Sequence, residues 1–298
     1  MKWLEITVTT APPAVEAVAD LLLSCRAGGV AEETVPSGQV KVRAYLPAGP
    51  SSAVALRALR GLLRRLPEYG LDAGRATVEA AEIDDERWAE AWKEYTRPFA
   101  VGRLWITPTW DRTPAPEGSV VVELDPGMAF GSGQHPSTRL CLDVVSRLVA
   151  AGMVVFDIGA GSGILAVAAA KLGAGRVLAR DLDPLAVEVA RRNVVHNAVA
   201  DRVTVEEGNL LQGVADQAHL ILANLTADLH LEFLPQAQSR LLPGGRLAAS
   251  GIVAERVADV VAAARRVGLA TEETLAEGEW RCLVLRPFAD PAGADAGR

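Results

Sequence analysis

The chain has 298 residues, half of them hydrophobic, so it is long enough to bury a large core and to form two domains. Its formal net charge of −7 and isoelectric point of about 5.3 argue against direct nucleic-acid binding. Asp157 interrupts the best apolar run and the N-terminus resembles no signal peptide, so no membrane segment is expected. The scattered Cys25, Cys141 and Cys282 indicate reduced thiols, which predicts a cytoplasmic protein without a metal site.

The first eighty or so residues predict a small α+β unit with the order β-α-β-β-α-β. Its strands are expected at residues 3–9, 29–35, 40–46 and 75–83, and its helices at residues 12–25 and 51–66. This order is that of a ferredoxin-like domain, assigned to residues 1–83. Such a domain either presents a surface to a partner or braces a larger domain.

Residues 84–97 begin with acids and carry an aromatic stripe before Pro98, which predicts a linker helix. Short strands at residues 101–110 and 120–124 lead into a second domain, assigned to residues 98–287. The last segment, residues 288–298, is rich in Pro, Ala, Asp and Gly and is expected to be a disordered tail.

From Pro136 onward strands and helices alternate with short loops, which predicts an α/β domain with a doubly wound parallel sheet. The seven strands are expected at residues 153–158, 176–181, 202–206, 218–224, 246–251, 269–276 and 280–287. The helices between them are expected at residues 162–172, 184–197, 226–241 and 254–267. Pro243-Gly244-Gly245 predicts a turn before the fifth strand. The last two strands have no helix between them, which predicts an antiparallel end to the sheet.

The most informative motif is a glycine-rich turn, Gly159 to Gly163, between an apolar strand and a helix. Glycines permit positive φ and close backbone approach, and the start of a helix offers unpaired N–H groups. Asp181 ends the next apolar strand, where a carboxylate can accept both hydroxyls of a ribose. These features predict a nucleoside-type cofactor at the carboxyl edge of the sheet. The alternative is a tight strand–helix turn without a ligand.

The spacing of this turn excludes a dinucleotide fingerprint, because Ile164 occupies the place of the third glycine. The run D-I-G-A-G-S-G from Asp157 to Gly163 instead resembles motif I of class I S-adenosylmethionine-dependent methyltransferases, whose sheet is Rossmann-like and seven-stranded. The resemblance implies that Asp157 lies beneath the methionine amino group. It also implies that the backbone of Gly159 and Gly161 lies against the methionine and ribose portions.

A second block, L-D-P-G-M-A-F-G-S-G-Q-H-P-S-T from Leu124 to Thr138, resembles a motif of one family, the bacterial ribosomal protein L-eleven (L11) methyltransferases. The family pattern is L-D-P-G-x-A-F-G-T-G-x-H-P-T-T. Other segments resemble its further blocks, at residues 88–92, 103–110, 181–184, 223–225, 250–252 and 279–280. The resemblance implies an enzyme that methylates lysine side-chain amines, with the N-terminal α-amine as a further acceptor, of large-subunit ribosomal protein L11. It also implies that the N-terminal domain recognises that protein.

The same resemblance assigns the site residues. Thr138, Gly159, Asp181 and Asn224 stand where the family binds S-adenosylmethionine. Phe130 and Gly131 are expected to cover the cofactor from the preceding loop.

Asn224 and Leu225 are the expected catalytic residues, because a carboxamide or a backbone carbonyl can orient the lone pair of an acceptor amine. The run that begins at Asn224 lacks the prolines of the [N/D]-P-P-[Y/F] signature, which favours a flexible alkyl amine over a planar nitrogen. Asn209 stands where many methyltransferases carry an acid near the adenine.

Simpler interpretations and rival functions stay open on the sequence alone. In the simpler interpretations, Asn224 is a turn residue at the end of a strand, and His135 is a structural residue in the turn that enters a helix. One rival is a lysine methyltransferase of the same fold that acts on another protein. A second rival is a non-catalytic, cofactor-binding factor in ribosome assembly.

Overall fold

The computed structural model describes residues 2–24, 30–35, 37–66, 72–84, 97–125, 131 and 133–288. It divides into two compact units, Met1–Thr96 and Arg97–Arg298. Nearly all of the predicted linker helix and of the predicted disordered tail lies outside the described residues.

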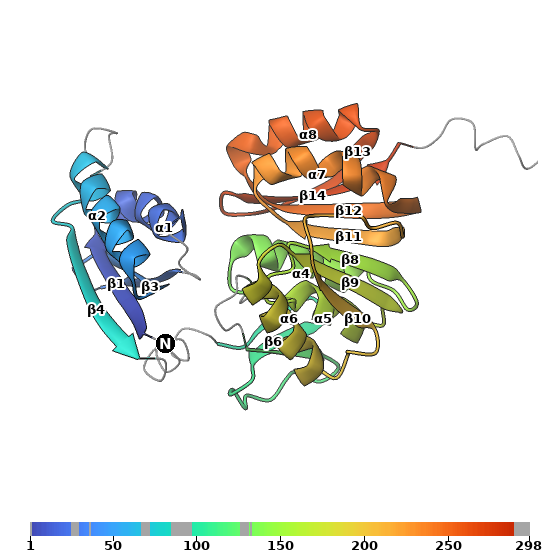
Figure 1. The fold of residues 1–298 in the computed structure, drawn as a ribbon, viewed down its shortest axis with the longest axis horizontal. Helices are drawn as coiled ribbons and strands as arrows, with labels where there is room; N and C mark the ends of the chain where they lie inside the picture. Colours follow the sequence, from blue (N-terminus) through green and yellow to red (C-terminus); the bar gives the residue numbers. More distant parts are fainter. Residues whose placement is uncertain are drawn as a thin grey trace, which may run out of the picture. The chain divides into compact units, whose positions relative to one another are not determined.

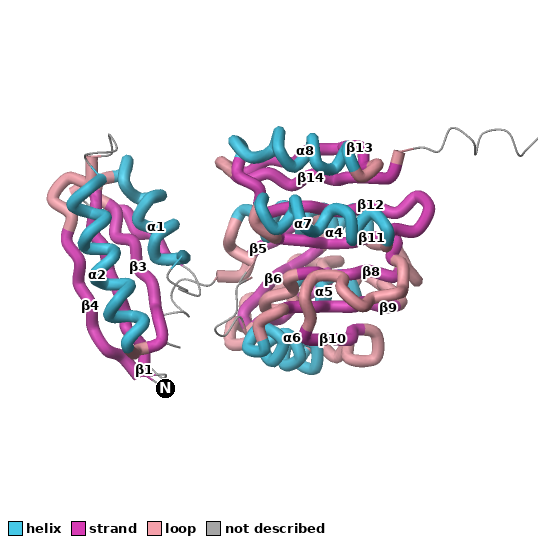
Figure 2. Tube along the Cα trace, turned by 45° about the horizontal axis from the view of Figure 1, so that its top comes forward, coloured by secondary structure: helices cyan, strands magenta, loops and turns pink. Residues whose placement is uncertain are grey.

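The N-terminal unit contains a four-stranded antiparallel sheet whose strand order is β2-β3-β1-β4 (Figures 1 and 2). Its elements are β1 (Lys2–Thr10), η1 (Pro12–Ala14), α1 (Val15–Ser24), β2 (Val30–Thr34), β3 (Val40–Pro47), α2 (Pro50–Arg65) and β4 (Thr77–Asp84). This strand order with two helices is the ferredoxin-like arrangement that the sequence predicts.

One apolar cluster joins the sheet of this unit to both of its helices. Alternation along the strands places Ile6 and Val8 of β1 on the same face as Val42 and Ala44 of β3, and all four are fully buried. Apolar residues of α1 and α2 complete the cluster, and Figure 2 shows both helices on one side of the sheet. Burial of this face is what stabilises the unit.

The C-terminal unit is built on a seven-stranded sheet with the order β10-β9-β8-β11-β12-β14-β13 (Figure 1). Before it come β5 (Phe99–Val101), β6 (Leu104–Pro108), β7 (Val120–Leu124) and α4 (Pro136–Leu148). The rest comprises β8 (Val154–Ile158), α5 (Ile164–Lys171), β9 (Arg176–Asp181), α6 (Pro184–His196), β10 (Val203–Glu207), β11 (Ala218–Asn224), α7 (Ala227–Ser239), β12 (Leu241–Val253), η3 (Ala254–Arg256), α8 (Val257–Arg266), β13 (Leu269–Glu277) and β14 (Trp280–Pro287). The strands from β10 to β12 pair parallel with one another, and β14 pairs antiparallel with both β12 and β13, which confirms the predicted doubly wound sheet and its antiparallel end.

Helices cover both faces of the large sheet. On one face α4, α5 and α6 share a core with alternate residues of the central strands, among them Val155 and Leu222. On the other face α7 and α8 pack on the intervening residues, among them Phe156 and Ile221. The central strands are buried on both faces, which explains why they read as continuous apolar runs.

The predicted turn at residues 243–245 is wrong as a strand boundary, because β12 already begins at Leu241. Ala218 of β11 pairs with Leu241, and Leu220 pairs with Arg246, so β12 contains extra residues between the two pairs. Pro243 and Gly244 lie in this irregularity, and Gly244 has a φ of 77°. Proline lacks a ladder donor and glycine tolerates positive φ, so they form a bulge within one strand.

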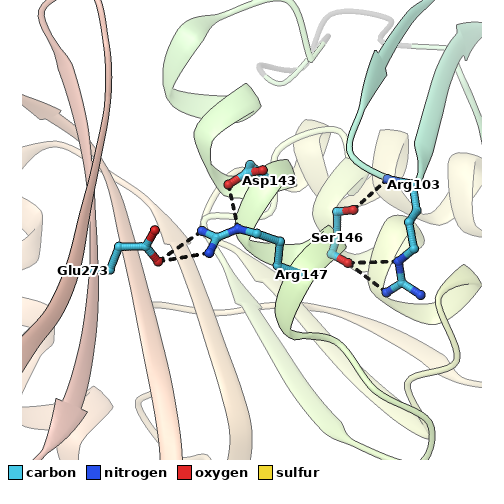
Figure 3. A network of polar contacts seen from close by, with 5 residues as sticks. All are labelled: Arg103, Asp143, Ser146, Arg147 and Glu273. Carbon is cyan, nitrogen blue, oxygen red and sulfur yellow. Dashed lines mark hydrogen bonds and ion pairs between the residues drawn. The ribbon is translucent and has the colours of Figure 1, made fainter.

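A small sheet, with the order β5-β6-β7, packs through its apolar residues on the face that carries α4 and α5. Polar contacts fasten α4 on both sides (Figure 3). From the β5–β6 turn, Arg103 donates its backbone N–H to Ser146 Oγ at 2.8 Å and two guanidinium N–H groups to Ser146 O at 3.1 and 2.8 Å. Arg147 pairs with Asp143 on α4 at 2.9 Å and with Glu273 of β13 at 3.1 Å.

Candidate functional site

The glycine-rich turn lies at the carboxyl end of β8, beside the end of β9. Gly159 has a φ of 72°, and a Cβ there would lie 2.5 Å from Leu225 Cδ2. Its amide donates to Arg180 O at 2.9 Å, so β9 holds the start of the turn. Only glycine satisfies both the conformation and the close approach of the Leu225 side chain.

Asp181 closes this turn from the neighbouring strand. Its Oδ2 accepts the backbone N–H of Gly161 at 2.9 Å, and its Oδ1 accepts that of Asp183 at 3.0 Å. The side chain is partly exposed at the sheet edge. Because each carboxylate oxygen has two lone pairs, both oxygens can accept a further hydrogen bond.

Asp157 is a second carboxyl near the turn, and it is completely buried. Its Oδ2 accepts the Ala166 N–H at 3.0 Å, whereas its Oδ1 has no partner among the described residues. Desolvation raises the pKa of Asp157 to about 8; the charge of Asp181 adds to the rise and the Ala166 N–H opposes it. A buried carboxyl with one unpartnered oxygen is a site for a cation or a donor group.

Asn224 and Leu225 lie at the end of β11 and connect the turn to α4. Asn224 Nδ2 donates to Thr138 Oγ1 at 3.1 Å, across 86 positions of the chain. Asn224 Oδ1 and Leu225 O both approach Gly251, where a Cβ would lie 2.9 and 2.5 Å from them. Both oxygen acceptors therefore lie close to the same backbone position, Gly251.

Gly131 is also fastened to the turn, because Ser162 Oγ donates to Gly131 O at 2.6 Å. Phe130, predicted to cover the cofactor together with Gly131, lies outside the described residues. Apart from Phe130, the structure brings the predicted site residues to one edge of the sheet. They are Thr138, Asp157, Gly159, Gly161, Asp181, Asn224, Leu225 and Gly131.

The sequence-based prediction missed two polar residues that hold this edge together, Asn193 and Ser250. Asn193 Nδ2 donates to Asp125 O at 3.1 Å and to Ser162 O at 2.8 Å. Ser250 O accepts the Leu225 N–H at 3.0 Å, and the Ser250 hydroxyl donates to Ser137 O at 2.8 Å. Each could have been found in the sequence as a polar residue at a position where the pattern of its helix or strand predicts burial. Asn193 lies on the buried face of α6, and Ser250 is fully buried.

Two histidines near this edge have structural contacts. His135 is the N-cap of α4: its Nδ1 accepts the Ser137 N–H at 3.3 Å, and its ring packs edge-on against Trp280 at 4.6 Å. His230 is buried with Nε2 2.8 Å from Ser250 O, and desolvation lowers its pKa to about 4. His230 is therefore neutral at physiological pH and supports the Ser250 carbonyl that anchors Leu225.

Metal-ligating side chains do not gather in the described ranges, where no group of three His, Cys, Asp or Glu residues could hold an ion. None of the helices that the structure describes combines the length and the apolarity needed to cross a bilayer.

Comparison with known proteins identifies the family. The family model described as ribosomal protein L11 methyltransferase (PrmA) matches residues 2–287. Curated ribosomal protein L11 methyltransferases from Pelotomaculum thermopropionicum and an Exiguobacterium species are 43% and 41% identical; each alignment covers 96% of this chain and 99% of the relative. A solved ribosomal protein L11 methylase from Lactobacillus delbrueckii subsp. bulgaricus superposes with a TM-score of 0.61 at 31% identity, covering 64% of this chain and 98% of that one. The chain belongs to the ribosomal protein L11 methyltransferase family.

Proposed function

We propose that this enzyme transfers methyl groups from S-adenosylmethionine to lysine side-chain amines, and to the N-terminal α-amine, of ribosomal protein L11. One observation carries the proposal: three distant segments meet at one sheet edge. Asn224 contacts α4 through Thr138, and Leu225 contacts the glycine turn through Gly159. The proposed enzyme acts in the cytoplasm, where ribosomal proteins are synthesised.

The residues at this edge fit S-adenosylmethionine. Asp157 Oδ1 is buried without a described partner, and the cationic amino group of the donor would supply one. Gly159 removes a side chain where the donor must approach the backbone. Asp181 keeps one lone pair on each oxygen for the two ribose hydroxyls. The proposed binding residues are Thr138, Gly159, Gly161, Asp157, Asp181 and Asn224, with Phe130 and Gly131 as cover.

When bound, the donor supplies an electrophilic methyl group on a positively charged sulfur. A lysine amine has an ordinary pKa of about 10.4, so it arrives mostly protonated at neutral pH. Desolvation and a neighbouring positive charge both lower that pKa, which releases the lone pair. Asn224 Oδ1 and Leu225 O accept hydrogens of the neutral amine and thereby aim its lone pair. Such positioning lowers a barrier by at most roughly 7–11 kcal/mol.

We assign substrate recognition to residues 1–83 and methyl transfer to residues 98–287. A cavity of about 350 Å³ in the N-terminal unit supports the first assignment. Arg60 and Arg64 of α2 line it, and in the described part of this unit neither has an ion-pair partner. Its lining also includes apolar Leu63 and Val78, and Asp72, whose carboxylate accepts the Gly74 N–H. This chemistry suits a carboxylate side chain of a protein substrate.

The test is to incubate the purified enzyme with isotope-labelled S-adenosylmethionine and purified L11. We expect label on lysine and α-amines, located by peptide mass spectrometry, and equimolar S-adenosylhomocysteine. Asn224→Ala is expected to lower turnover at saturating donor at least about 100-fold, because the amine loses its orienting acceptor.

The rival functions give different results in this assay. Label that appears only in another protein of a lysate would support a methyltransferase with a different substrate. Binding of both donor and L11 without S-adenosylhomocysteine would support the assembly factor and contradict our proposal.

A further inference from the structure

Arg180 is a buried cation immediately before Asp181, and the proposed function gives it no role. Arg180 is only 9% exposed to solvent. Its Nη1 donates to Leu210 O at 3.0 Å and to Gln212 O at 2.9 Å, and Glu206 lies 3.8 Å from Nε. Nε has no hydrogen-bond partner among the described residues. The hydrogen bonds and Glu206 compensate only part of the cost of burying this charge, so Arg180 is weak evidence for a gain in stability. We therefore look for its role in the backbone conformation that it holds.

That geometry belongs to residues 208–212, which follow β10. Gly208 N–H donates to Asp181 O at 2.9 Å, which ties the segment to the strand that bears the proposed ribose ligand. Any Cβ at Gly208 would collide with the Arg180 guanidinium. Leu210 has a φ of 48°, a conformation that a non-glycine residue keeps only when its surroundings hold it. Arg180 supplies that hold by binding the Leu210 carbonyl.

The order of strands tells which part of the donor meets this segment. The glycine turn follows β8, Asp181 ends β9, and residues 208–212 follow β10, and these three strands are neighbours in the sheet. Methionine, ribose and adenine follow one another in S-adenosylmethionine. With the ribose on Asp181 and the methionine on the turn, the adenine lies toward β10.

We propose that Arg180 is a positioning residue that fixes residues 208–212 as the wall against which the adenine of the donor packs. This inference rests on the proposed function. Arg180 sets donor affinity through the backbone of this segment and through Asn209, which the segment presents in an exposed position. It touches neither the methyl group nor the acceptor amine, so it leaves the chemical step unchanged.

The full chain with Arg180→Met tests the proposal by calorimetric titration with S-adenosylhomocysteine. We expect affinity to fall about tenfold or more, while kcat at saturating donor stays within about twofold of the original enzyme. Arg191→Met is the matched control. Arg191 also donates two guanidinium hydrogen bonds to a carbonyl of β10, Val205 O, at 3.2 and 2.9 Å, and among the described residues it has no hydrogen bond to residues 208–212. Its loss is expected to leave donor affinity unchanged.

Gly208→Ala provides a second route if Arg180→Met does not fold. The added methyl group displaces the guanidinium without removing its charge, so the same loss of affinity is expected. Combining both changes should weaken binding no more than the larger single change does, because they act on one contact. Full additivity would contradict the proposed coupling.

Three outcomes separate this inference from the proposed function. Unchanged donor affinity in folded Arg180→Met or Gly208→Ala overturns the role of Arg180. Unchanged affinity in Asp181→Ala as well overturns the donor site itself. Equal losses in Arg180→Met and Arg191→Met show general destabilisation of β10 and also overturn the inference.

Discussion

Asp157 and Asp181 lie on neighbouring strands, yet their surroundings give the two carboxyls different properties. Asp181 is partly exposed and both of its oxygens accept backbone N–H groups. Asp157 is fully buried, its Oδ1 has no hydrogen-bond partner in the described part of the chain, and its pKa is raised to about 8. In our proposal Asp181 accepts the neutral ribose hydroxyls, and Asp157 receives the cationic amino group of the donor.

Replacing Asp181 by Ala should weaken donor binding by at least about tenfold, because two ribose hydrogen bonds and the Gly161 contact disappear. Asp183→Ala is the control. Asp183 caps α6 by accepting the Leu185 N–H at 2.9 Å, so its loss should reduce stability by about 1 kcal/mol and spare donor affinity. Calorimetry on both variants checks the prediction. Equal affinities in the two would place the ribose elsewhere.

Donor affinity should rise with pH between about 6 and 8. Below its pKa of about 8, Asp157 is protonated in the donor-free enzyme, and a cationic amino group binds the ionised form better. Donor affinity should rise at most tenfold per pH unit. In Asp157→Asn the affinity should be lower and nearly independent of pH over this range. A flat profile for the original enzyme would contradict the assignment.

The Asp157 carboxyl also predicts that the donor-free protein becomes less stable as pH rises. The pKa of Asp157 in the folded state is raised above its ordinary value of 3.8, so over this pH range the folded state holds a proton that the unfolded state has released. The stabilisation is complete below about pH 4 and is lost as pH rises through about 8. At about 1.4 kcal/mol per pKa unit, the loss is on the order of 5 kcal/mol. Urea denaturation from pH 5 to pH 8 should show a decline that Asp157→Asn reduces.

At the scale of elements, α4 is the helix whose position decides whether Thr138 meets Asn224. The ion pairs of Arg147 are about two-fifths exposed, so each contributes at most about 1 kcal/mol. The bonds from Arg103 to Ser146 are partly buried and fix the β5–β6 turn on α4 (Figure 3). We therefore expect this turn to contribute more than the ion pairs do.

Gly102→Ala tests that expectation. Gly102 has a φ of 54°, and a Cβ there would collide with the Ser146 side chain. The free energy of unfolding should fall by about 2–3 kcal/mol, from backbone strain plus the collision. Gly118→Ala is the control, since Gly118 has a φ of 79° with nothing within 4 Å of a Cβ, and it should lose only about 1 kcal/mol. Equal losses in urea denaturation would show that the contact with α4 is immaterial.

At the scale of the whole molecule, two compact units in one chain carry separate tasks in our proposal. The double variant Arg60→Glu with Arg64→Glu should raise the KM for L11 by about tenfold or more, because the cavity then repels carboxylates. Donor affinity, measured by calorimetry, should not change. Arg57→Glu, on the same helix but outside the cavity lining, is the matched control. A KM unchanged relative to that control would remove the cavity from recognition.

Local patterns in the sequence were enough to predict the features that depend on near neighbours in the chain. The alternation of strands and helices, the glycine turn and an acid at the end of β9 follow from local patterns of size, polarity and backbone freedom. The bulge of β12 could not be predicted, because Pro243 and Gly244 are as typical of a loop as of an interrupted ladder. β12 pairs with β11 both before and after Pro243 and Gly244, which shows that these residues interrupt a strand and do not form a loop between two elements.

Local sequence could not predict which side chains meet or how strongly water is excluded from them, because both depend on how the unit packs. The bond between Thr138 and Asn224 spans 86 positions, and that between Arg180 and Leu210 spans 30. The raised pKa of Asp157 follows mainly from burial. Contacts and desolvation arise from segments that are distant in the chain and close in space. Local sequence therefore specifies the parts of this site, and packing of the sheet and helices determines their chemistry.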